Sequence, residues 1–197
     1  MPGFLELVRT RRSVRKYADT PVPRAVLERC LEAARLAPSA CNSQPWTFVV
    51  VDEPALRSRL AAAAFGGVHA INSFAAAAPV FVAVIRGRST VAAAFGGALR
   101  GLQYNLIDVG IACEHFILQA AEEGVGTCWL GWFDESAVKR VLGLDRRDKV
   151  DILISMGYER ERPDAGAAGG DLKRSIVCNA EKKRKSLAEM SRFNLGE

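Results

Sequence analysis

The chain has 197 residues, of which 49% are hydrophobic and 25% charged, and its formal net charge is +5. This balance is typical of a globular protein with a core of ordinary size, and it excludes a disordered or low-complexity chain. The five cysteines are widely spaced and form no Cys-x-x-Cys pair, so the sequence predicts neither a disulfide framework nor a zinc site.

The sequence shows no sign of export or of a membrane span. Charged residues at Glu6 and Arg9 come before any apolar signal region could form. No stretch approaches the roughly 18 uninterrupted apolar residues of a membrane helix. We therefore expect a cytoplasmic protein without membrane contact, folded as a single domain over residues 1–197.

Helical and strand patterns alternate along the chain. Apolar residues at the spacing i, i+3, i+4 and i+7 predict helices, and short β-branched apolar runs predict buried strands. In chain order, helices are expected at 4–10, 24–37, from 52 to about 66, from within 92–101, at 105–123, between 134 and 143, and at 181–197, and strands at 47–51, 80–85 and 150–156. Residues 163–170 consist mainly of Gly, Ala and Pro and are expected to be flexible.

Several helix ends carry recognisable signals. Asp52 followed by Pro54 predicts an N-terminal cap and first turn. Gly124 and Gly126 are expected to end the longest helix, at 105–123. That helix is apolar around most of its circumference, so we expect it to be buried on nearly all sides, either as a central helix or against a partner subunit.

Residues Arg9–Lys16 carry five positive side chains and no negative one, with Ser13 in their midst. Guanidinium forks and a hydroxyl in so short a space suit a phosphate-bearing ligand, because each fork donates two charge-assisted hydrogen bonds. A solvated basic surface or an arm for nucleic acid is the alternative. Taken alone, the stretch favours the solvated surface.

Other phosphate and metal motifs are missing from the sequence. It has neither a P-loop motif nor a Gly-x-Gly-x-x-Gly motif between a strand and a helix. His69 and His115 have no Cys, Asp or Glu at metal-ligand spacing, and Cys41 has no histidine partner for nucleophilic catalysis. We therefore expect no metal and no catalytic side chain, and a bound cofactor that carries the chemistry.

A polar loop, Ala37–Trp46, joins a predicted helix to a buried strand. It holds two amides, two hydroxyls and an indole between two prolines. An ordinary capped connection uses the same turn residues. The same groups on a stiffened loop also suit a planar heteroaromatic ligand with donors and acceptors along its edge.

Several segments, in a fixed order along nearly the whole chain, resemble a known family. They are Arg11–Arg15, Ala37–Trp46, Ala120–Gly131 and Ser155–Tyr158, followed by the basic pair Lys173 and Arg174. Together they resemble the nitroreductase family of FMN-dependent oxidoreductases. The resemblance implies an α+β fold with a central, mainly antiparallel sheet flanked by helices, assembled as an intertwined homodimer.

The resemblance also implies where FMN binds, in clefts at the dimer interface. Its phosphate and ribityl end would be held by Arg11, Arg12, Ser13 and Arg15, joined by Lys173 or Arg174. The residues that meet the flavin from the other subunit would be Pro38, Ser39, Ala40 and Asn42. The residues that lie against its ring and present backbone N–H groups would be Trp129, Leu130 and Gly131.

The implied reaction is a ping-pong exchange. NADH or NADPH gives a hydride to flavin N5, and a nitroaromatic, a quinone or a similar small acceptor then takes the electrons. Reductive dehalogenation, destruction of the flavin, and flavin binding without a reductase role stay open as alternatives. In this family, the region that corresponds to residues 86–101 usually covers the substrate. In this chain it contains no motif that matches the family. With the basic stretch assigned to FMN, no nucleic acid partner is expected.

Overall fold

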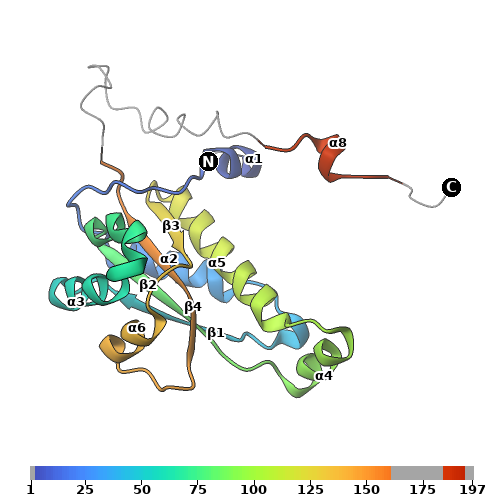
Figure 1. Ribbon diagram of the computed structural model, residues 1–197. Helices are drawn as coiled ribbons and strands as arrows, with labels where there is room; N and C mark the ends of the chain where they lie inside the picture. Colours follow the sequence, from blue (N-terminus) through green and yellow to red (C-terminus); the bar gives the residue numbers. More distant parts are fainter. Residues whose placement is uncertain (1–2, 161–183, 194–197) are drawn as a thin grey trace.

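A four-stranded sheet forms the centre of the computed structural model, which describes residues 3–160 and 184–193. The strands are β1 (Trp46–Val51), β2 (Val80–Arg86), β3 (Gly126–Leu130) and β4 (Lys149–Gly157), in the spatial order β1-β2-β4-β3. All neighbouring strands are antiparallel, and helices cover both faces of the sheet (Figure 1). The expected α+β fold is confirmed, whereas the homodimer stays a prediction.

The helices alternate with the strands as the sequence pattern predicts. They are α1 (Phe4–Thr10), α2 (Arg24–Arg35), α3 (Pro54–Ala64), α4 (Val91–Arg100), α5 (Tyr104–Glu122), α6 (Glu135–Leu142) and α8 (Leu187–Met190), with 3₁₀ segments η1 (Ala40–Asn42) and η2 (Gly67–Ala77). Asp134 caps α6 as expected, since its carboxylate accepts the Ala137 N–H at 2.9 Å.

Two of the predicted helix starts are wrong in detail. Glu53, not Asp52, caps α3, because the Glu53 carboxylate accepts two backbone N–H groups of its first turn. Residues 92–101 are not only the start of a helix. They hold nearly all of α4, which Gly101 ends in the left-handed conformation with φ 64°.

The C-terminal prediction is only partly covered by the described residues. The prediction of a charged helix at 181–197 is wrong for residues 184–193, because only Leu187–Met190 is helical there. The segment expected to be flexible, 163–170, lies outside the described residues.

Strand β3 is missing from the sequence prediction. Gly124 ends α5 with φ 73°, but Gly126, expected to end the same helix, is the first residue of β3. The strand has five residues and pairs only with β4, at the edge of the sheet. The segment begins with glycine and contains no run of β-branched apolar residues, which explains why the pattern did not predict it.

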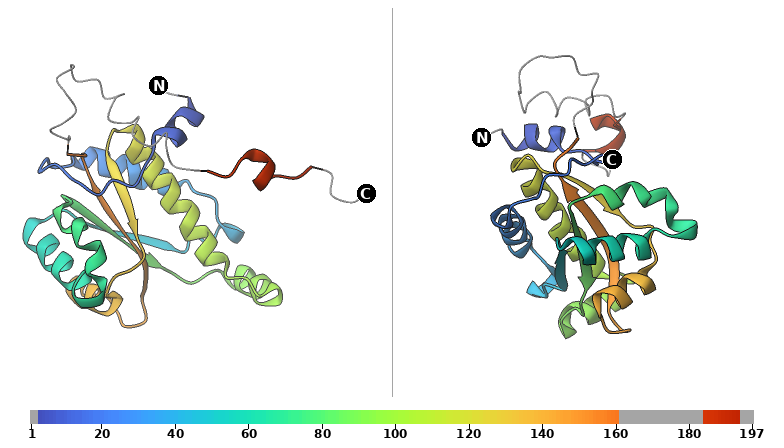
Figure 2. Two further views of the ribbon diagram at one scale, coloured as in Figure 1. Left: turned by 45° about the horizontal axis from the view of Figure 1, so that its top comes forward. Right: turned by 90° about the vertical axis from the view of Figure 1, so that its left-hand side faces the viewer.

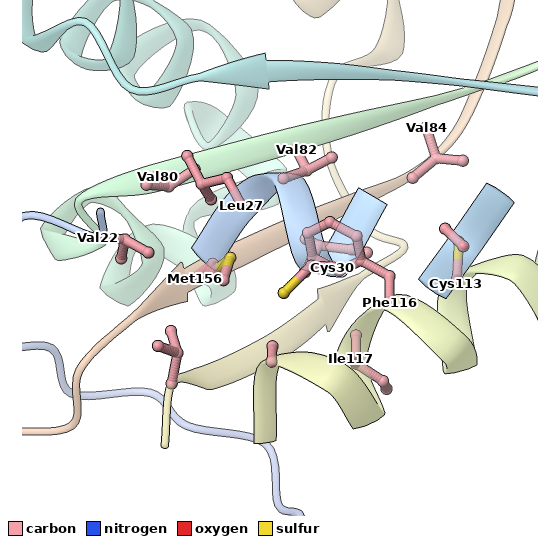
Figure 3. Packing of buried hydrophobic residues seen from close by; sticks show 14 of the residues in the cluster. Val22, Leu27, Cys30, Val80, Val82, Val84, Cys113, Phe116, Ile117 and Met156 are labelled. Atoms are coloured by element: carbon pink, nitrogen blue, oxygen red, sulfur yellow. The ribbon is translucent and has the colours of Figure 1, made fainter. Parts of the chain in front are cut away.

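The sheet is buried on both faces, and alternation along its strands separates two hydrophobic clusters. Val80, Val82 and Val84 of β2 belong to the cluster shared with α2 and α5, drawn in Figure 3. Phe81 and Ala83 belong to the cluster shared with α3 and α6. Because successive side chains of a strand point to opposite faces, one continuous apolar run serves two cores.

Helix α5 crosses one face of the sheet beside α2, opposite η2 and α6 (Figure 2). Phe116 of α5 lies in the core and stacks on Phe48 of β1, with ring centroids 5.7 Å apart. The other side of α5 is open, since Leu106 is 43% and Ile107 50% exposed. The prediction of burial on nearly all sides is therefore wrong for a single chain, and α5 is not a central helix. No helix of the described residues has the length and apolar character needed to cross a membrane.

Candidate functional site

The basic stretch lies along the free edge of the sheet, next to β3. Val14 donates its backbone N–H to the Thr127 carbonyl of β3 at 2.9 Å, and Ser13 pairs with Thr127 as a parallel bridge. A Cβ at Gly126 would lie 2.4 Å from Val14 Cγ2, so glycine permits the two segments to approach each other. Main-chain hydrogen bonds thus set the path of residues 11–18, called the basic segment below.

Tyr17 anchors the far end of the basic segment. It is 1% exposed, and its hydroxyl donates to the Val14 carbonyl at 2.7 Å and lies 2.8 Å from Ser155 Oγ. Burial is the main reason that the pKa of Tyr17 is raised above its ordinary value. The phenol therefore stays neutral and acts as an anchor. Beside it, Ala18 donates its N–H to the Tyr158 carbonyl at 2.8 Å, just after β4.

Two arginines of the basic segment meet carboxylates. Arg12 forms an ion pair with Glu159, which follows β4, and Arg11 Nε lies 3.9 Å from Glu114 Oε1 of α5. The side chains of Arg11 and Arg12 are 23% and 19% exposed. An anionic ligand at this edge would therefore compete with carboxylates for the same guanidinium groups.

Arg15 connects the basic segment to η2. Its guanidinium carbon lies 5.8 Å from the centroid of the Phe74 ring, a cation–π arrangement. The same η2 segment is tied to the chain just after β3. Asn72 Nδ2 donates to the Trp132 carbonyl at 2.9 Å, and Trp132 Nε1 donates to the Val68 carbonyl at 3.0 Å. Direct contacts therefore link the basic segment, η2 and the end of β3.

The end of β3 offers main-chain groups more than side chains. Because Thr127 bonds outward to the basic segment, the alternation of an antiparallel strand turns the backbone groups of Trp129 to the same edge. Leu130 is 2% exposed, and its side chain belongs to the core. Gly131 is exposed, and a Cβ there would meet nothing within 4 Å. The space beside the main chain at Gly131 is therefore open.

The loop before β1, residues 38–44, is strained and held partly by its own side chains. Ser39 Oγ accepts the Gln44 N–H at 3.0 Å, and Gln44 Nε2 donates to Asn42 Oδ1 at 3.1 Å. Cys41, Asn42 and Gln44 have positive φ values of 50°, 49° and 44°. Residues other than glycine adopt this left-handed conformation at a cost, and such residues cluster at binding sites. Residues 38–44 are called the strained loop below.

Two helices contact the strained loop from outside. Asp108 Oδ1 of α5 accepts the Ala40 N–H at 3.0 Å, and Ser43 Oγ lies 3.1 Å from Thr90 Oγ1 at the start of α4. Asp108 is 3% exposed. Asp108 belongs to no motif of the sequence, but its position carries a signal, because it lies at helical spacing from the buried Phe116 on the apolar face of α5.

Within one chain, the predicted site residues fall into two groups. The group around β3 contains Arg11, Arg12, Ser13, Arg15, Trp129, Leu130 and Gly131, and the group in the strained loop contains Pro38, Ser39, Ala40 and Asn42. The strained loop contacts α5 near its start, whereas β3 follows its end, and Figures 1 and 2 show this separation. From Asp108 to Glu122, α5 rises about 21 Å. Lys173 and Arg174 lie outside the described residues.

The titratable groups offer little acid–base chemistry. Burial raises the pKa of the Cys30 and Cys113 thiols to about 12, so both stay protonated. His115 Nδ1 lies 3.2 Å from the Ala33 carbonyl oxygen, as in a satisfied structural histidine. In the part of the chain that the structure describes, no three His, Cys, Asp or Glu side chains are grouped to hold a metal ion. The arrangement suits binding of an anionic ligand that brings its own chemistry.

Comparisons with known proteins match the chain over most of its length. A family model described as "Nitroreductase family" matches residues 8–158. A Thermus thermophilus protein named "NADH dehydrogenase" is 32% identical over 177 residues, covering 77% of this chain and 84% of the relative. A Rattus norvegicus protein named "Iodotyrosine deiodinase 1" is 29% identical, covering 88% of this chain and 67% of the relative.

A solved structure shares the fold. It is described as "FMN-dependent Nitroreductase" from Clostridium difficile R20291, and it matches with a TM-score of 0.64 at 26% identity, covering 81% of this chain and 89% of that one. The region matched by the family model contains nearly all the elements of the site, from the basic segment to β3. The chain therefore belongs to the nitroreductase family.

Proposed function

We propose that this chain is an FMN-dependent oxidoreductase. It would use NADH or NADPH and a small acceptor, such as a nitroaromatic or a quinone, in ping-pong order. When bound, FMN supplies the ring that exchanges electrons with both. The observation that carries the proposal is the pairing of the basic segment with β3. This pairing brings Arg12, Ser13 and Arg15 to the same sheet edge as the main chain of Trp129 and Gly131.

The chemistry of this edge fits FMN. Guanidinium and hydroxyl donors suit a phosphate, and the open space at Gly131 lets main-chain groups approach a planar ring. Arg11 would join the phosphate group, and so would Lys173 or Arg174. These cations would hold the phosphate end of the cofactor, while the main chain after β3 would orient its ring.

We also propose that a second copy of the chain supplies the strained loop. One chain keeps the loop and the basic segment at opposite ends of α5, so it does not assemble the proposed site alone. The open side of α5 supports this arrangement. With α1 and α2 it borders a mostly apolar groove of ≈ 580 Å³, whose lining includes Phe4, Leu7, Leu36, Ile111 and Leu118. A homodimer would cover this groove and complete two sites.

The names of the relatives support the cofactor and the co-substrate. The Clostridium difficile structure is described as FMN-dependent, and the Thermus thermophilus relative is named an NADH dehydrogenase. For this chain, both remain parts of the proposal. The single domain over residues 1–197 and the cytoplasmic location are proposed with them.

Reductive dehalogenation is a second candidate, favoured by the relative named iodotyrosine deiodinase 1. It would use the same FMN site with a different acceptor. Residues 86–101, which contact the strained loop through Thr90, would then select the acceptor. No contact in the described residues favours destruction of the flavin, or flavin binding without a reductase role, over these two reactions.

The test begins with the purified full chain and added FMN. Retained flavin absorbance and a sedimentation coefficient of a dimer are expected. Oxidation of NADH and NADPH is then measured with a nitroaromatic, a quinone and iodotyrosine as acceptors, and parallel double-reciprocal plots indicate ping-pong order. A chain that stays colourless after incubation with FMN contradicts the proposal. Salt-sensitive binding to DNA would favour a nucleic acid partner instead.

A further inference from the structure

We propose that Asp108 is the positioning residue of the strained loop. By accepting the Ala40 N–H, its carboxylate would keep the loop in the conformation that binds FMN. The inference rests on the proposed function, because it takes the strained loop to be part of an FMN site. It concerns a residue that none of the motifs in the sequence includes.

Asp108 is a costly residue if stability is its only role. It is 3% exposed, and only Oδ1 has a partner, the Ala40 N–H at 3.0 Å. Oδ2 is buried and has no hydrogen-bond partner among the described residues. A buried carboxylate with one hydrogen bond loses more hydration than it regains. A group of this kind on the apolar side of a core helix indicates a role beyond folding.

The strained loop needs a contact that fixes it from outside. Cys41, Asn42 and Gln44 are all left-handed, and such a conformation persists only where the surroundings enforce it. Hydrogen bonds within the loop move with the loop and cannot set its position. The contact from α4 comes from a helix that is itself largely exposed. Asp108 differs, because α5 is anchored in the core through Phe116.

The experiment compares Asp108→Ala with Asp108→Asn in the full chain. Flavin fluorescence measures the dissociation constant for FMN, and the melting temperature of the FMN-free protein is recorded in parallel. Asp108→Ala removes the acceptor of the Ala40 N–H, so we expect its dissociation constant to rise about tenfold. Asparagine keeps one oxygen for this bond, and we expect Asp108→Asn to recover most of the affinity.

Cys41 reports on the loop itself, without turnover. It is exposed, while the other cysteines of the described residues are buried, and a Cys178→Ser background removes the remaining thiol. In the parent and in Asp108→Asn, saturating FMN should slow the reaction of Cys41 with an aromatic disulfide reagent. In Asp108→Ala this protection should be lost at saturating FMN, because the loop is no longer fixed.

Glu53→Ala is the matched control. Glu53 also accepts backbone N–H groups with its carboxylate, and it lies beyond the opposite end of β1 from the strained loop. It should lower the melting temperature and leave the dissociation constant for FMN unchanged. If Asp108→Ala does not fold, Asp108→Ser replaces it, because a serine hydroxyl is too short to reach the Ala40 N–H.

Two results would overturn the proposal. One is an Asp108→Ala variant that binds FMN as tightly as the parent. The other is an equal loss of affinity in Glu53→Ala, since the effect would then follow from lower stability. If instead the proposed function is wrong, the unsubstituted chain itself binds no FMN. FMN binding by the unsubstituted chain therefore distinguishes the two failures.

Discussion

The basic segment and the strained loop carry the two halves of the proposed site, yet they are held in opposite ways. Main-chain hydrogen bonds at Val14 and Ala18 and the buried ring of Tyr17 fasten the basic segment to the sheet. The strained loop contains no strand. Side chains such as Ser39 and Asp108 hold it in a left-handed conformation.

In the basic segment, the groups that set the backbone path differ from those proposed to bind the ligand. In the strained loop, some residues would do both. In the basic segment, backbone pairing sets the path, so its cations are left to pair with carboxylates, as Arg11 and Arg12 do, or with a competing anionic ligand. In the strained loop, side chains set the path, and some of them, such as Ser39, lie in the stretch proposed to meet the flavin. Substitutions in the basic segment should therefore affect mainly stability or mainly binding, whereas substitutions that loosen the loop should affect binding through its conformation.

The largest effect is expected at Tyr17, the anchor of the basic segment. Tyr17→Ala removes a buried ring and its hydroxyl contacts, and it should lower the free energy of unfolding by about 4 kcal/mol. Tyr17→Phe loses only the hydroxyl and should cost about 1 kcal/mol. Urea unfolding followed by circular dichroism measures both. Equal costs would show that the hydroxyl rather than the ring is the anchor.

Gly126 tests the close approach of the basic segment to β3. Gly126→Ala places a methyl group against Val14 and should lower the free energy of unfolding by about 2 kcal/mol. In a Val14→Ala background the same substitution should cost much less, because the clash is relieved. Urea unfolding of the two single variants and the double variant gives the coupling. Additive costs would mean that the two residues do not meet.

The arginines test whether path and binding are separate in the basic segment. Arg12→Ala and Arg15→Ala should each weaken FMN binding about tenfold, because a charge-assisted contact to the phosphate is lost. The urea midpoint of Arg15→Ala should stay close to that of the parent, whereas Arg12→Ala also breaks the ion pair with Glu159 and should lower it. Arg24→Ala, an exposed arginine of α2 paired with Glu28, is the control for a general loss of charge. Full flavin occupancy in both site variants would reject the assignment.

The smallest effect is expected in the strained loop, at Cys41. Cys41→Gly relieves the left-handed strain at φ 50°, which stabilises the folded chain. Glycine also raises the entropy of the unfolded chain, which offsets part of this gain. The free energy of unfolding should therefore rise by only about 0.5 kcal/mol. Cys41→Ala keeps the strain and should show no gain. Thermal unfolding of the FMN-free protein compares the two. A gain in the alanine variant would point to the thiol instead of the backbone.

Strong local patterns made much of the fold predictable. The predicted strands at 47–51, 80–85 and 150–156 agree with β1, β2 and β4 to within one residue at each end, because apolar runs rich in β-branched residues are distinctive. The same approach missed β3, a five-residue edge strand. Periodicity also predicts burial of α5 on nearly all sides, which a single chain does not provide, and its burial against a partner subunit stays a prediction, because periodicity shows which residues are apolar and not what covers them.

The sequence alone determined the family, through its motifs, and the strands β1, β2 and β4, through their apolar runs, since both are properties of neighbouring residues, while the antiparallel sheet and the segments proposed to bind FMN were implied by the resemblance to that family. Only the tertiary structure decided that Thr127 receives the basic segment, that the two halves of the site stand at opposite ends of α5, and that Asp108 holds Ala40. These contacts join residues far apart in the chain. The role of the buried Asp108 carboxylate among apolar neighbours can be recognised only once the fold shows which backbone N–H it accepts.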